Sequence, residues 1–153
     1  MIMYKTLVRP KLEYASSIWD PGQSSLIASL EVIQNRSVHF ICSNYHRTAN
    51  ISLMKANLSL PHLSVRRKIA RLSLFHKLYY TNVTVRERLF ELPFYVSSRV
   101  DHQHKVGIPH SNCNASYHSF VRCTSHEWNH LPVPIVSIVD SVLFKKALIS
   151  IFT

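Results

Sequence analysis

The segment RRKIARLSLFHK, residues 66–77, carries five basic residues and no acidic one. Arginine and lysine side chains contact phosphate groups, and such contacts bind RNA or DNA without reading its sequence. On a helix, four of these side chains face away from an apolar stripe. We call these four the basic rim: Arg66, Arg67, Arg71 and Lys77. The pattern predicts weak binding of RNA or single-stranded DNA through the basic rim.

A structural interpretation of the same helix competes with this one. The apolar stripe consists of Val65, Ile69, Leu72 and Tyr79. Leu74 and Leu78 interrupt the basic side, which indicates a helix that is buried on more than one face. In that case the arginines pair with carboxylates inside a bundle, at Glu13, Glu31 or Glu87. The two interpretations differ in whether the basic rim is exposed together or paired and buried.

The overall charge favours an anionic partner. The chain has 18 lysines and arginines against 8 aspartates and glutamates, a net charge of +10 with its ten histidines neutral. Such an excess is typical of proteins that bind nucleic acid, and less often of proteins that bind acidic membrane surfaces. A solvated basic surface without a specific partner is the simpler alternative.

The sequence lacks the patterns of phosphoryl-transfer catalysis. Two-metal chemistry needs clustered carboxylates, but the three aspartates, Asp20, Asp101 and Asp140, are isolated from one another. A phosphate-binding loop needs several glycines, and the chain has only Gly22 and Gly107, each alone. We therefore expect no catalytic residue, no cofactor and no enzymatic activity.

Histidines and cysteines gather between positions 102 and 130. Cys123, His126 and His130 have spacings found in zinc sites, but a zinc finger needs a second paired cysteine upstream, and Cys113 stands alone. Exposed histidines on loops and on one short helix explain the pattern more simply. We expect no metal, and zinc-dependent binding ranks last among the possible functions.

The three scattered cysteines, which include Cys42, do not form a disulfide framework. They predict an intracellular protein of the nucleus or cytoplasm, in which the five Asn-x-Ser/Thr sequons stay unused. Residues 1–10 contain Lys5 and Arg9 and lack the apolar core of a signal peptide. No apolar run approaches the ~20 residues of a membrane span, so we expect no membrane partner.

Apolar spacing predicts a mainly α fold, with a small helical bundle in residues 1–92. We expect a first helix over residues 2–18 with a break near Arg9, because Pro10 removes a backbone hydrogen bond. A second helix begins at Ser24 or Ser25 and ends near Asn44. A third follows Thr48, and a fourth follows Pro61 and carries the basic rim.

Residues 93–153 have a different sequence pattern, with short apolar runs between polar residues. They predict a minor β-hairpin, with strands at residues 96–109 and 117–121, and two short helices. Thr124 and Ser141 are the expected caps of these helices, which end at Trp128 and Ile149. We expect this part to pack on the bundle as one structural unit, with Trp19 and Trp128 both buried.

Several stretches together resemble a known family. They are YKTLVRPKLEYASSIWDP at 4–21, LEVIQNRSVHFI at 30–41, LPHLSVRRKIARL at 60–72, SFVRCTSHEWNHLP at 119–132 and LFKKAL at 143–148. In order and spacing they resemble the carboxy-terminal region of reverse transcriptases from LINE-type, non-LTR retrotransposons of animal genomes. The resemblance covers nearly the whole chain.

The resemblance implies a noncatalytic region that follows a reverse transcriptase domain, which is the implied partner in a full-length parent. The aromatic-x-Asp-Asp motif that holds the family's catalytic aspartates has no counterpart here. Where relatives read Phe-Pro-Arg-Thr-x-Arg, this chain has Cys123 and His126 in place of the arginines. Such changes suggest the second hypothesis, a decayed transposon reading frame whose product is a structural module with no retained activity.

Overall fold

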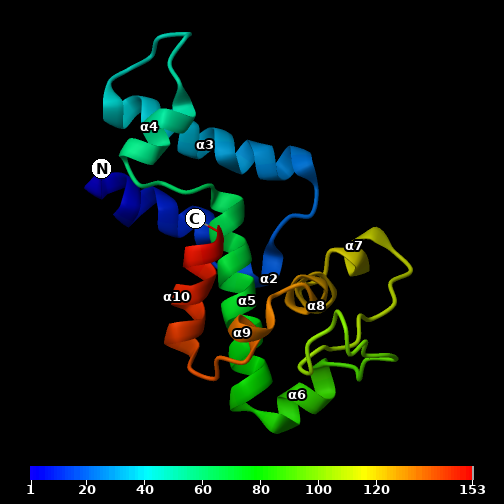
Figure 1. The fold of residues 1–153 in the computed structure, drawn as a ribbon. Helices are drawn as coiled ribbons and strands as arrows, with labels where there is room; N and C mark the ends of the chain where they lie inside the picture. Colours follow the sequence, from blue (N-terminus) through cyan, green and yellow to red (C-terminus); the bar gives the residue numbers. More distant parts are fainter. Residues whose placement is uncertain (153) are drawn as a thin grey trace.

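The computed structural model describes residues 1–152, and within them it contains ten α-helices, one short π-helical segment and no strand (Figure 1). The prediction of a mainly α fold is confirmed. In chain order the elements are η1 (Tyr4–Val8), α1 (Arg9–Glu13), α2 (Ser16–Trp19), α3 (Ser24–Cys42), α4 (Ile51–Asn57), α5 (Leu63–Thr81), α6 (Val83–Leu89), α7 (Asn114–Tyr117), α8 (Phe120–Asn129), α9 (Val133–Val136) and α10 (Ser141–Phe152).

The amino-terminal helix is interrupted later than the sequence predicts. Pro10 lies in the first turn of α1, directly after the π-helical turn of η1, where its missing N–H is tolerated. The chain leaves the helix after Glu13 and turns at Ala15, which has a left-handed φ of 50°. The turn redirects α2 so that it packs against α5.

The second and third predicted helices are confirmed. α3 ends at Cys42 because Ser43 adopts a left-handed φ of 49° and donates its N–H to the carbonyl of His39. α4 begins after Asn50, whose Oδ1 accepts a hydrogen bond of 3.1 Å from the N–H of Leu53. The start of α4 follows from the type of the residue that caps it, because asparagine is a preferred N-cap residue.

Helix α5 runs through the middle of the molecule, and α2, α3, α8 and α10 pack against it (Figure 1). Its residues Ile69, Leu72 and Phe75 are buried in the main core. The other members of this core all lie further along the chain: Phe90, Val106, Trp128, Leu131, Val136, Phe144 and Leu148. Burial of these side chains is the main stabilising contribution to the fold.

The predicted β-hairpin is wrong. The second expected strand, residues 117–121, instead joins the end of α7 to the start of α8. Phe120, Thr124 and Trp128 are spaced four residues apart and therefore share one face of a helix. Thr124 is accordingly a buried residue within α8 and does not cap it.

The first expected strand also forms no ladder within the described residues. The N–H of Val106 donates to Oδ1 of Asn129 at 3.0 Å, and its carbonyl accepts from Nδ2 of Asn129 at 2.8 Å. One side-chain amide thus satisfies the backbone that a partner strand would otherwise pair with. Trp128 adds a hydrogen bond of 2.9 Å from its Nε1 to the carbonyl of His104.

The two tryptophans differ in burial. Trp128 is fully buried, with 0% of its surface exposed, and it packs at 5.0 Å between ring centroids against Phe75. The prediction for Trp128 is confirmed. Trp19 is 44% exposed, so the prediction of its burial is wrong. α10 begins at Ser141 as expected, but the side chain of Asp140 accepts the first N–H groups of that helix.

Candidate functional site

The structure divides the basic rim into an interior pair and an outer pair. Arg67 and Arg71 lie inside the molecule, with 1% and 9% of their side chains exposed. Both contact the carboxylate of Asp20, and Nε of Arg67 lies 2.7 Å from its Oδ1. Arg71 also donates to Glu127 on α8, at 2.9 Å from its Nη2 to Oε1. These four residues form a buried ion cluster.

The buried ion cluster connects three segments that are distant in sequence. Asp20 follows α2, the two arginines belong to α5, and Glu127 belongs to α8. Burial of the Arg67 guanidinium lowers its pKa, because the charged form loses hydration. A guanidinium that is buried and paired with carboxylates is not presented to a phosphate backbone. Arg67 and Arg71 therefore act first as structural residues.

Arg66 is partly exposed and pairs with Glu13 of α1 through two hydrogen bonds, of which the one from Nη2 to Oε2 is 3.0 Å. This hydrogen-bonded pairing raises the pKa of Arg66. Glu13 is one of the three partners that the sequence suggested. Glu31 instead binds Lys55, and its Oε2 accepts the N–H of Leu63 at 3.0 Å, where α5 begins.

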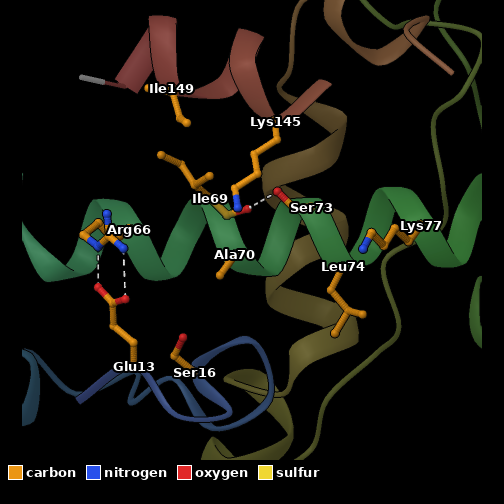
Figure 2. Close-up of a pocket in the computed structure, with 10 residues that line it drawn as sticks. All are labelled: Glu13, Ser16, Arg66, Ile69, Ala70, Ser73, Leu74, Lys77, Lys145 and Ile149. Atoms are coloured by element: carbon orange, nitrogen blue, oxygen red, sulfur yellow. Dashed lines mark hydrogen bonds and ion pairs between the residues drawn. The ribbon is translucent and has the colours of Figure 1, made fainter. Parts of the chain in front are cut away.

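The fourth member of the rim, Lys77, is exposed and lines a cavity of about 530 Å³ between α5, α10 and the amino-terminal helices (Figure 2). Lys145 of α10 lines the same cavity, and its side chain points toward α5. Neither lysine forms an ion pair within residues 1–152. Sequence reasoning missed Lys145, because only packing brings α10 beside α5.

The cavity has the chemistry of an anion site. Two lysines line it together with Ser16 and Ser73, and Glu13 is the only acidic residue of its lining. The hydroxyl of Ser73 donates to the carbonyl of Ile69 at 2.7 Å, a bond drawn in Figure 2. Lysine ammonium groups bind phosphate as point charges. The arrangement can hold a phosphate group, but it supplies no nucleophile activated by a neighbouring base.

A larger share of the acidic side chains than of the basic side chains forms ion pairs in the described chain. Five of the eight carboxylates take part in ion pairs among residues 1–152. Six of the 18 lysines and arginines do so, which leaves twelve without a carboxylate partner in that range. Most of the negative charge is thus neutralised by neighbouring side chains, and the excess positive charge remains available to solvent or to a ligand.

No three histidine, cysteine or acidic side chains converge on a common point within the described chain. His126 of α8 and His130, the residue that directly follows this helix, have ring centroids 4.5 Å apart, but Cys123 does not form a three-residue cluster with them. The aspartates outside the buried ion cluster serve local roles: Asp101 pairs with Lys105 at 2.7 Å, and Asp140 caps α10. Asp101 and Asp140 thus stabilise local backbone structure.

The fold and the cavity define a small all-helical module with a strongly cationic surface. Comparison with models of protein families, with curated proteins and with solved structures finds no significant match to this chain. Among residues 1–152, none of the helices has the length and apolar character needed to cross a membrane.

Proposed function

We propose that this chain is a noncatalytic module that binds RNA or single-stranded DNA, as the carboxy-terminal region of a LINE-type reverse transcriptase. The observation that carries the proposal is the charge distribution: twelve cations without a carboxylate partner among residues 1–152, while most carboxylates are engaged. The sequence resemblance supports the same class. The three free cysteines fit an intracellular site of action, in the nucleus or cytoplasm.

Within this proposal, Lys77 and Lys145 make the principal phosphate contacts. They line one cavity, they have no carboxylate partner in the described chain, and they come from two different helices. Arg66 stands at the same cavity but shares its charge with Glu13. The basic rim therefore contributes to binding through Lys77 more than through its buried arginines.

The test is fluorescence anisotropy with a labelled 12-nucleotide RNA and a DNA strand of the same sequence, over a salt series. Each phosphate contact on a single strand contributes about −0.7 to the log–log slope of affinity against salt. The variant K77Q/K145Q should therefore flatten the slope by about 1.4. The matched control K11Q/K146Q removes the same charge from exposed lysines that do not line the cavity.

Each outcome has a defined meaning. Equal flattening by both double variants would contradict a specific role of the cavity. Absence of salt-dependent binding by the wild-type chain would contradict nucleic-acid binding altogether. In that case the decayed reading frame with only a structural module remains, and frameshifts or stop codons around the open reading frame would support it.

The structural module is the second candidate because of the buried ion cluster. Replacing Arg67 and Arg71 by glutamine tests the two roles together. If these arginines served mainly as phosphate contacts, R67Q/R71Q would stay folded and the salt slope would flatten. If R67Q/R71Q does not fold, the two arginines have a structural role, as their burial indicates.

A further inference from the structure

The amino-terminal helices and α3 leave large apolar side chains exposed on one face. Ile2 is 78% exposed, Met3 71%, Leu7 58% and Phe40 73%. They line an open groove of about 740 Å³, the other apolar lining residues of which are Met1, Tyr4, Val8 and Ile41. An exposed apolar patch of this kind marks an interaction surface more often than a solvated one.

The floor of the groove is well anchored. Tyr4 is 4% exposed and packs with Val38 in a second core cluster. Its hydroxyl donates to Oε1 of Gln34 at 2.8 Å, and Nε2 of Gln34 donates to the carbonyl of Pro61 at 3.0 Å. The hydrogen bond between Tyr4 and Gln34 thus joins the two helical segments that form the walls, and the groove is open in the chain without a partner.

The charges around the groove have one sign. Arg36 lines it, and Lys5 and Arg9 lie on the same amino-terminal segment. Residues 1–12 and 32–50 contain no aspartate or glutamate. The nearest carboxylates in sequence, Glu13 and Glu31, are both engaged in ion pairs. The groove thus has a basic residue and no carboxylate in its lining, and two further basic residues lie on the segment that forms one wall.

We propose that this groove binds an amphipathic helix of a protein partner, whose apolar stripe is flanked by aspartate and glutamate. The lining stretches 1–8 and 36–41 each cover about two helical turns, which matches an apolar ridge at positions i, i+3 or i+4, and i+7. The charge border supplies the complementarity that orients such a helix. The proposal is independent of nucleic-acid binding at the other cavity.

The groove geometry favours a helix over two other occupants. A bilayer surface is flat and would contact the exposed tips of the walls without filling the groove between them. A second copy of this chain would bring an identical cationic border against the first, and like charges facing each other oppose association. A helix with acidic flanks satisfies both the shape and the charge.

The probe is a fluorescein-labelled 16-residue peptide, helical by design, with leucines at i, i+4, i+7 and i+11 and glutamates beside them. A second peptide carries lysine in place of every glutamate. In anisotropy titrations, the full chain should bind the glutamate peptide at least tenfold more tightly than the lysine peptide. The difference should shrink at 0.5 M salt, because screening shortens the range of the charges.

Two variants and one control locate the binding. F40S should weaken binding of the glutamate peptide at least tenfold, and the matched control F94S, at a phenylalanine that is also exposed, should not change it. R36E should reverse the preference toward the lysine peptide. Because Phe40 and Arg36 are both exposed, circular dichroism of these variants should match the wild type.

Four results would overturn the proposal. They are equal binding of both peptides, an unchanged affinity in F40S and R36E, Phe40-dependent sedimentation with vesicles of 70% phosphatidylcholine and 30% phosphatidylserine without peptide binding, and Phe40-dependent dimerisation in sedimentation velocity. The third result would assign the groove to a membrane surface, and the fourth would assign it to a second copy.

Discussion

Asp20→Asn is expected to destabilise the fold far more than an ordinary surface substitution. Asp20 is the carboxylate that Arg67 and Arg71 share, and its own side chain is 14% exposed. The substitution preserves size but removes the negative charge. Arg71 keeps Glu127 as a partner at 2.9 Å, whereas Arg67 has no other carboxylate within 4.0 Å in the described chain.

The magnitude follows from the uncompensated charge on Arg67. Removing one partner of a buried ion pair costs about 3–5 kcal/mol. Because the Arg71 charge remains compensated, the lower end, about 3 kcal/mol, is the expected loss in the free energy of unfolding. With a urea m-value of about 2 kcal/mol per molar, the unfolding midpoint should fall by about 1.5 M. A domain with a total stability of about 5–15 kcal/mol loses a large fraction of it.

Urea unfolding at pH 7, followed by circular dichroism and tryptophan fluorescence, measures this loss. Glu87→Gln is the matched control, because Glu87 is exposed and forms no ion pair within residues 1–152. It should change the free energy of unfolding by less than about 0.5 kcal/mol. Arg67→Met in the Asp20→Asn background should recover stability, because it removes the unpaired charge.

The reasoning is refuted if Asp20→Asn shifts the midpoint no more than Glu87→Gln does. The arginines would then not depend on Asp20 in solution, and Arg67 would be available for phosphate contacts. Failure of Arg67→Met to recover any stability would refute the narrower statement that an unpaired guanidinium causes the loss.

Further predictions concern the tryptophans, pH and catalysis. In urea unfolding, Trp128→Ala should cost about 3–5 kcal/mol, whereas Trp19→Ala should cost less than about 1 kcal/mol because Trp19 is 44% exposed. Burial lowers the pKa of His76, whose Nε2–H donates to the carbonyl of Ile138 at 2.6 Å. Since the unfolded chain binds this proton more tightly, stability should decline as the pH falls below about 6.5, and His76→Phe should show a smaller decline in parallel urea titrations. Primer-extension assays with Mg²⁺ or Mn²⁺ should show no template-dependent incorporation, because the chain has no paired aspartates; incorporation lost on mutating one aspartate would contradict this.

Local sequence determined much of the helical framework. The apolar spacing within each helix involves residues three or four positions apart. The hydrogen bonds at the end of α3 and at Asn50, before α4, also join residues three or four positions apart, so they can form before any tertiary contact. The burial of Trp128 followed from its place between a helix and a Leu-Pro turn. The same local reasoning failed at residues 96–109, where the backbone of Val106 pairs with the side chain of Asn129, a contact that leaves no pattern in the local sequence.

Only the tertiary structure decided the state of the charges. The sequence around Arg67 and Arg71 does not reveal whether these side chains are exposed or buried. Their partners Asp20 and Glu127 lie far from them along the chain. Likewise, Lys77 and Lys145 share a cavity only because α10 packs beside α5. Ion pairs and cavities depend on distances in space. Local sequence patterns specify those distances within a helix, whereas between helices the packing of the core specifies them.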